Sequence, residues 1–196
     1  MTPTPPTYPA RPVNGGPLPQ LLKYPRPGRW IGEPKVNGWR TLVHAETGTM
    51  FNRQGERLSI AGEFKEALTK LWRLNLANWY DCEAFERRHP MGRGCLVVLD
   101  IPMADVDYEH RRLMMLGLPL LPLIPTNAIE DTICRLPGID MPDVRDSWDT
   151  LQQANKVLGC EFYEGLVLKK ATSNYPMQLR SPDVECPDWL KSRWAF

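Results

Sequence analysis

The residues with the clearest chemical potential begin around Lys35, in the segment from Glu33 to Arg40 with the sequence EPKVNGWR. A neutral lysine amine is a nucleophile, but a free lysine has a pKa of about 10.4 and is almost entirely protonated at pH 7. Nearby cations and partial burial disfavour the ammonium form and so favour the nucleophile. Taken alone, a lysine followed by a glycine before a strand is more typical of an ordinary surface turn.

Further segments downstream place charged side chains in or beside stretches rich in strand-forming residues. In chain order they are Arg53–Gly55 (RQG), Asp81–Glu83 (DCE), Leu99–Ile101 (LDI), Glu164–Lys169 (EGLVLK) and Trp189–Arg193 (WLKSR). Any one of these segments is a weak signal. Together with the lysine segment they make six in a fixed order, which changes the interpretation of Lys35.

This series resembles the nucleotidyltransferase motifs of ATP-dependent DNA ligases, RNA ligases and mRNA capping enzymes. The matching motifs are KxDGxR at Lys35–Arg40, RxG at Arg53–Gly55, DGE at Asp81–Glu83, EGxVxK at Glu164–Lys169 and LKxK at Leu190–Arg193. The resemblance runs from about Glu33 to Arg193. It implies a nucleotidyltransferase (ATP-grasp-like) domain of antiparallel sheets flanked by helices.

The resemblance also implies a mechanism, in which Lys35 is the catalytic residue that attacks the α-phosphate of ATP. Arg40, Lys169 and Lys191 would be the cations that favour the neutral amine and stabilise the charge that builds on the phosphate. The AMP held on Lys35 would then pass to a 5′-phosphate, and a 3′-hydroxyl would seal the nick. The expected substrate is nicked nucleic acid, with duplex DNA favoured over RNA.

Each remaining role is carried over to the matching position. The nucleotide contacts would be Glu33 to the adenine amino group, Arg40 and Glu83 to the ribose, Val167 and Leu99 to the adenine faces, and Lys169 and Lys191 to the AMP phosphate. Arg53 would read the strand end near the nick. Glu164 would bind Mg²⁺, which prefers oxygen ligands.

Departures from the family pattern keep alternatives open. Asn37 stands where the family has aspartate, so a negative charge is lost, and Leu99 replaces an aromatic that stacks on adenine. An RNA ligase and a catalytically weak nucleotide- or nick-binding protein are therefore alternatives. A capping-type guanylyltransferase is a further rival, which Glu33 argues against because a carboxylate suits the adenine amino group.

The sequence that must position these residues is mixed in character. We expect an α+β domain over 29–196, with strands near 39–45, 50–53, 79–85, 95–101, 118–124, 165–170 and 189–194, and helices near 60–74, 107–116 and 147–158. Ser147 and Gly159 are the expected caps of the last helix. Trp189 and Trp194 are expected to pack in the interior, and Tyr175 is a weak candidate for stacking on nucleic acid.

Residues 1–28 are rich in proline, which disfavours helix and strand pairing, so we expect an extended tail that packs over the domain or stays disordered. Many ligases continue into an OB-fold domain. The chain ends soon after the last motif, so we expect a minimal form in which a partner protein, a clamp or this tail takes that place.

Composition sets the remaining expectations. The net charge is +1, so nucleic acid would have to meet a local basic surface rather than a globally basic protein. The five cysteines are widely spaced and unpaired in sequence, which argues against a disulfide framework or a zinc site. No apolar run is long enough to span a membrane, and the amino terminus lacks the apolar core of a signal peptide. We therefore expect a cytoplasmic protein, and the resemblance to compact ligases suggests a bacterial or virus-infected cell.

Overall fold

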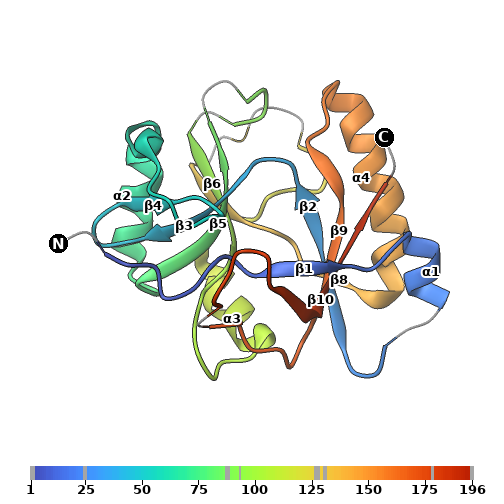
Figure 1. Ribbon diagram of the computed structural model, residues 1–196. Helices are drawn as coiled ribbons and strands as arrows, with labels where there is room; N and C mark the ends of the chain where they lie inside the picture. Colours follow the sequence, from blue (N-terminus) through green and yellow to red (C-terminus); the bar gives the residue numbers. More distant parts are fainter. Residues whose placement is uncertain are drawn as a thin grey trace.

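The protein is described by a computed structural model of residues 3–23, 26–86, 89–92, 94–125, 129, 132–177 and 179–194. Two five-stranded sheets form its centre (Figure 1). Sheet A has the order β1 (Arg11–Asn14), β10 (Glu185–Arg193), β9 (Tyr163–Lys170), β2 (Trp30–Val36), β8 (Ile139–Asp140). Sheet B has the order β4 (Thr49–Phe51), β3 (Trp39–His44), β5 (Trp79–Phe85), β6 (Cys95–Asp100), β7 (Ile133–Arg135). All neighbouring strands are antiparallel except the β1–β10 and β6–β7 pairs, so the predicted α+β fold of antiparallel sheets is confirmed.

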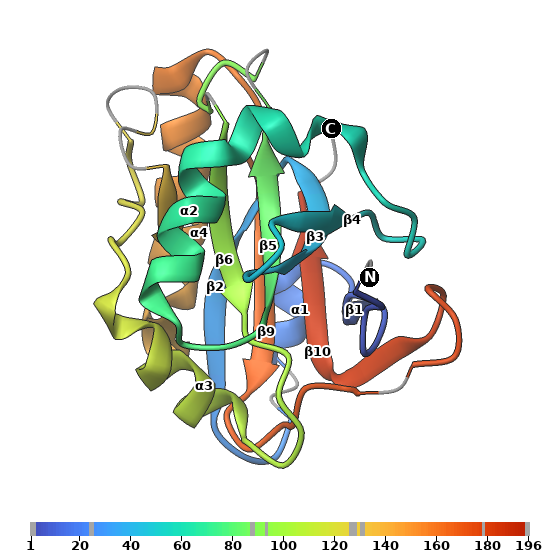
Figure 2. The same ribbon diagram turned by 90° about the vertical axis from the view of Figure 1, so that its left-hand side faces the viewer.

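Helices flank both sheets. They are α1 (Leu18–Lys23), α2 (Lys65–Leu74), α3 (Tyr108–Met114) and α4 (Val144–Leu158), with short 3₁₀ turns at Ser59–Phe64, Met115–Gly117 and Met141–Asp143. In Figure 2, α2 lies across β5 and β6. Its buried stripe, which includes Leu68 and Leu71, shares a core with Leu96 and Val98 of β6. No helix in the described part of the chain is long and apolar enough to cross a membrane.

A second core lies between the sheets and beneath α4. Val97 and Leu99, on the other face of β6, join Leu166 and Leu168 of β9 and Leu151 of α4. Because side chains alternate along a strand, Val167 and Lys169 of β9 lie on the opposite face of sheet A from Leu166 and Leu168. That opposite face carries the candidate site.

The chain passes from sheet A to sheet B immediately after Lys35. Only Asn37 and Gly38 separate β2 from β3. A Cβ atom at Gly38 would lie 2.9 Å from the carbonyl oxygen of Ala84 and 2.9 Å from Cγ of Glu83, so only glycine allows this approach. This short connection therefore keeps Lys35, at the end of β2 in sheet A, close to the start of β3 in sheet B.

Most sequence-predicted elements are present, and some need correction. The predicted strand near 118–124 is wrong: apart from one isolated bridge at Leu120 the segment is irregular, since Pro119 and Pro122 cannot donate to a sheet. The helix predicted from residue 147 begins at Val144, so Ser147 lies inside it rather than capping it. Its expected end is confirmed, because Gly159 adopts the left-handed conformation (φ 64°).

The proline-rich amino-terminal segment is more ordered than proline content alone suggests. β1 pairs with β10 in parallel, and α1 follows directly. The expectation that proline prevents helix here is wrong, because Pro19 occupies the first turn of α1, where a missing N–H costs nothing. The segment does pack over the domain, as one of the two expectations for it proposed.

Candidate active site

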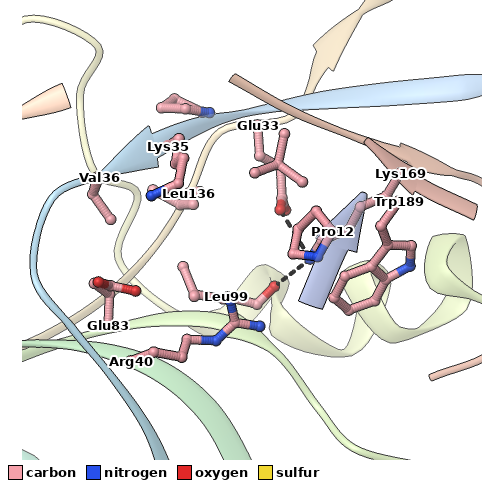
Figure 3. A pocket seen from close by; sticks show the side chains of 12 residues that line it. Pro12, Glu33, Lys35, Val36, Arg40, Glu83, Leu99, Leu136, Lys169 and Trp189 are labelled. Carbon is pink, nitrogen blue, oxygen red and sulfur yellow. Dashed lines mark hydrogen bonds and ion pairs between the residues drawn. The ribbon is translucent and has the colours of Figure 1, made fainter. Parts of the chain in front are cut away.

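The candidate site consists of two adjoining cavities on one face of sheet A. The first, the inner pocket (Figure 3), is lined by Pro12, Glu33, Pro34, Lys35, Val36, Arg40, Glu83, Leu99, Leu136, Val167, Lys169 and Trp189. The second, the outer groove, is lined by Pro9, Ala10, Arg11, Pro12, Lys35, Gly38, Arg40, Arg53, Glu83, Glu164, Lys191 and Arg193. Lys35, Arg40 and Glu83 line both cavities. Every site residue predicted from the sequence therefore lines at least one of them.

Strand register explains how distant segments meet here. Lys35 of β2 lies opposite Gly165 of β9, which lies opposite Arg193 of β10. A Cβ atom at Gly165 would lie 2.0 Å from the carbonyl oxygen of Ser192, and its φ of 144° excludes other residues. The glycine of the EGxVxK-like motif thus lets β9 and β10 approach closely beside the lysine.

Lys35 is held by a carboxylate. Its Nζ donates to Oε2 of Glu164 at 2.5 Å, and Nη2 of Arg193 lies 3.0 Å from the same oxygen. The side chains of Lys35 and Glu164 are mostly buried. Arg193 occupies the last position of the LKxK-like motif, so the motif itself could have pointed to it, although it was not among the predicted site residues.

Arg40 and Glu83 form the wall on the sheet B side. Arg40 Nε lies 2.5 Å from Oδ1 of the fully buried Asp81. Burial alone would lower the pKa of Arg40, but the Asp81 carboxylate outweighs this effect, so the pKa is raised. Glu83 accepts a hydrogen bond from the backbone N–H of Gly38 at 3.1 Å. Burial raises the pKa of Glu83 to about 7, against the opposing charges of Arg40 and Lys35.

At its inner end the pocket reaches a group of four charged side chains and one tyrosine that we call the buried charge cluster: Glu33, Asp100, Arg111, Lys169 and Tyr108. Lys169 Nζ lies 3.0 Å from Glu33 Oε2 and 3.0 Å from the carbonyl oxygen of Leu99 (Figure 3). The same atom lies 3.3 Å from Oδ2 of Asp100. It also lies over the rings of Tyr108 and Trp189. Lys169 thus lines the pocket with its Nζ already bound to three acceptors, at the end away from the Lys35–Glu164 pair.

The remaining members of the cluster pair with its two carboxylates. Arg111 donates to both oxygens of Asp100, at 2.7 and 3.1 Å, and the hydroxyl of Tyr108 donates to Glu33. Burial opposes ionisation of Asp100, but Lys169 and Arg111 outweigh it and lower the pKa of the carboxyl. Two buried carboxylates therefore face two buried cations. Tyr108 and Arg111 lie outside the sequence motifs and were not predicted.

The outer groove is strongly cationic. Among the described residues that line it, six carry positive charge and two carry carboxylates. Burial lowers the pKa of Lys191, and the neighbouring charges of Arg11, Arg193 and Lys35 add to this effect. Clustered cations at an accessible surface suit a ligand with several phosphates. Arg53 lies at the rim, where it pairs with Asp183.

Two aromatic predictions can be compared with the structure. Trp189 is fully buried, as expected. Tyr175 is also buried, and its hydroxyl donates to Asp81 at 2.6 Å, so the idea that it stacks on nucleic acid is wrong.

Solved structures with a similar fold include DNA ligases. The ligase domain of M. tuberculosis LigD superposes with a TM-score of 0.59 at 19% sequence identity, over 95% of this chain and 59% of that domain. The chain has the fold of a DNA ligase domain. A Lig E DNA ligase matches this ligase fold with a TM-score of 0.58 at 12% identity, over 99% of this chain and 70% of its own. The Chlorella virus DNA ligase-adenylate gives 0.57 at 12% identity, over 95% and 69%.

The similarity to these ligases is one of fold. No protein-family model matches the sequence, and no curated protein matches it. The chain spans about three fifths of the LigD ligase domain. A mycobacterial DNA ligase D with the same ligase fold was solved as a complex with ATP and MES, at 18% identity and a TM-score of 0.58.

Proposed function

We propose that the protein is an ATP-dependent polynucleotide ligase that stores AMP on Lys35 and uses it to seal nicks between a 5′-phosphate and a 3′-hydroxyl in DNA. The observation that carries this proposal is the position of Lys35, which lines both the apolar inner pocket and the cationic outer groove. A nucleoside in the first cavity and phosphates in the second would place the α-phosphate of ATP beside this amine.

The inner pocket has the character of a nucleoside site. Val36, Leu99, Leu136 and Val167 supply apolar walls on which a purine can lie. Glu33 lines the pocket as an acceptor, and its carboxylate is oriented by Lys169 and by the Tyr108 hydroxyl. A fixed carboxylate accepts a hydrogen bond from an amino group, which adenine offers at the position where guanine carries an oxygen. This supports ATP over GTP.

In the first step the Lys35 amine attacks the α-phosphorus of ATP. A bond forms between Nζ and phosphorus, the bond from phosphorus to the bridging oxygen breaks, and pyrophosphate leaves with the electron pair. The ammonium group must lose one proton before it attacks and a second as the phosphoramidate forms. Glu164 Oε2, at 2.5 Å, is within reach to accept one, and the other passes to water in the open groove. Arg193 and Lys191 line the same groove and would stabilise the developing charge on the phosphate.

Magnesium fits this arrangement through Glu164. Mg²⁺ is commonly bound by one or two carboxylates together with the phosphates of a nucleotide. Among the described residues no group of three or more His, Cys, Asp or Glu side chains forms a ready-made metal site, so the nucleotide would have to supply most of the ligands. When bound, the ion would neutralise phosphate charge, and Glu164 would be its protein ligand.

In the later steps the AMP moves from Lys35 to the 5′-phosphate of a nicked strand, and the 3′-hydroxyl then attacks that phosphate and releases AMP. The outer groove supports this sequence because cations from β1, β2, β3, β10 and the residues after β4 line it around Lys35. A duplex backbone would add its own phosphates along the same surface.

The test is a two-stage labelling experiment. The protein is incubated with Mg²⁺ and with ATP or GTP labelled at the α-phosphate, and the denatured chain is examined for covalent label. Labelled protein is then mixed with nicked duplexes whose nicked strand is DNA or RNA. We expect label from ATP alone, lost from Lys35→Ala, followed by sealing of the DNA nick.

The other outcomes point to defined alternatives. Label from GTP would indicate a guanylyltransferase, and sealing restricted to RNA would indicate an RNA ligase. Absence of label with both nucleotides would contradict the proposal and leave a binding protein.

A further inference from the structure

The amino-terminal segment contributes one cation to the outer groove. Arg11 opens β1, which the sequence motifs do not include, and it lies opposite Glu185 of β10. The backbone on both sides is fixed: the Ala10 N–H donates to the Tyr175 hydroxyl at 3.1 Å, and the Gly15 N–H donates to the carbonyl of Lys191 at 2.9 Å. Arg11 is therefore presented to the groove from an anchored strand.

Arg11 and Arg53 converge on a single carboxylate oxygen. Nη1 of Arg11 lies 3.3 Å from Oδ1 of Asp183, and Nη2 of Arg53 lies 3.6 Å from the same atom. Arg11 also lies 3.5 Å from Glu185. The Asp183 side chain is 78% exposed, so this contact stands at the open rim of the groove. One anionic oxygen shared by two guanidinium groups is the arrangement in which arginines also bind a phosphate oxygen.

We propose that Arg11 and Arg53 form a binding site for a substrate phosphate and that Asp183 occupies this site until the phosphate displaces it. Exposed ion pairs contribute little to stability, so Asp183 is readily displaced. A terminal phosphate carries a charge of about −1.5 to −2 at pH 7, against −1 for a carboxylate, and offers three oxygens instead of two. The more highly charged ligand wins the competition for the two arginines.

This inference rests on the proposed function and adds to it a residue outside the recognised motifs. The phosphate has two chemical sources in a ligase reaction: the 5′-phosphate of a nicked strand, and the β- and γ-phosphates that leave as pyrophosphate. Both present terminal phosphate oxygens to the groove. The experiment below separates them and requires no adenylylation, so its outcome is independent of the labelling test.

Binding is measured on the full chain without ATP, using two probes. The first is a fluorescent nicked DNA duplex with either a 5′-phosphate or a 5′-hydroxyl at the nick, and the second is inorganic pyrophosphate. The variants are Arg11→Gln, Arg11→Lys and Asp183→Asn. Arg29→Gln is the matched control, because Arg29 is also a solvent-accessible arginine paired with two carboxylates, Glu109 and Asp140, but it does not line the groove.

We expect Arg11→Gln to weaken phosphate-dependent binding about tenfold, Arg11→Lys to retain part of it, and Asp183→Asn to strengthen it a few-fold. Loss of the preference for the 5′-phosphorylated nick assigns the site to the strand end, whereas loss of pyrophosphate affinity assigns it to the nucleotide. The proposal is overturned if Arg11→Gln behaves like Arg29→Gln with both probes, or if Asp183→Asn binds them no more tightly than the parent protein.

Discussion

The two ends of the candidate site use charge in opposite ways. In the buried charge cluster, Lys169 has a side-chain exposure of 3% and pairs with the carboxylates of Glu33 and Asp100. Arg111 donates two hydrogen bonds to Asp100. In the outer groove, Arg193 and Arg53 are about half exposed, and their carboxylate partners lie at 3.0 and 3.6 Å. Removing one partner of a buried ion pair destabilises the fold, whereas an exposed arginine contributes little to stability and is available to a ligand.

This difference separates two lysines to which the sequence motifs assign the same role. Lys169 and Lys191 are both expected phosphate contacts, yet the first is bound to three acceptors in the interior and the second lines the open groove. On this basis we assign Lys169 chiefly to positioning Glu33 and the β9–β10 face. Lys191 and Arg193 are the better candidates for direct contact with phosphate.

The largest expected effect is on stability and belongs to the buried cluster. Lys169→Met leaves Glu33 without a cationic partner in the interior, which we expect to lower the free energy of unfolding by about 3–5 kcal/mol. Denaturant titration measures this change. Lys170→Met is the control, because this side chain is about one third exposed and its ion pair with Asp188 is long, at 3.9 Å, so we expect a change within about 0.5 kcal/mol. Similar losses in the two variants would remove the distinction between the two regions.

The second effect is a pH dependence of stability that arises from Glu83. Its pKa is raised from 4.5 to about 7 in the folded protein, so between these values the folded state holds a proton that the unfolded state has lost. Stability therefore falls as the pH rises from 4.5 to 7, by at most about 3 kcal/mol, and stays low above pH 7. Glutamine at this position does not titrate. We therefore expect the stability of Glu83→Gln, relative to that of the parent protein, to be higher at pH 8 than at pH 5.

Thermal unfolding at the two pH values checks this prediction. Glu46→Gln, in the exposed turn after β3, is the control and should follow the parent protein at both. A Glu83→Gln difference that is the same at pH 5 and pH 8 would show that this carboxyl does not titrate in the window.

The smallest expected effect on stability belongs to the outer groove. Arg193→Gln removes an ion pair whose arginine is half exposed, and Glu164 keeps Lys35 as a partner, so we expect the free energy of unfolding to change by less than about 1 kcal/mol. Because the same side chain faces the reacting phosphate in our proposal, adenylylation should fall about a hundredfold. Arg145→Gln, on the exposed face of α4, should leave both quantities unchanged. A destabilised Arg193→Gln with a normal adenylylation rate would reverse our assignment.

Sequence patterns predicted the elements whose own residues carry the signal. The strand at 79–85 and the buried strand from residue 95 were correct because alternation and continuous apolar character are local properties. β2 was not predicted, since Pro34 interrupts its pattern, although it lies in the middle of sheet A. β1 was missed for a different reason, because it exists only through pairing with a strand that is distant in the sequence.

The candidate site follows the same division. The motif positions at Lys35, Glu83 and Glu164 were identified from types and order of residues, and the structure brings them together around the groove. The partners of these residues were not predictable, because Tyr108 and Arg111 reach the site from α3 through tertiary packing. The same applies to Arg11, whose place depends on the register between β1 and β10.

The most direct measurement is the location of covalent AMP on the chain. The protein is incubated with ATP and Mg²⁺, digested, and mapped by mass spectrometry. We predict a mass increase of one adenylyl group on the peptide that contains Lys35, at the lysine itself, with none on the peptides that contain Lys169 or Lys191. Adenylylation at either of those lysines, or an unmodified Lys35 after prolonged incubation, would contradict the account.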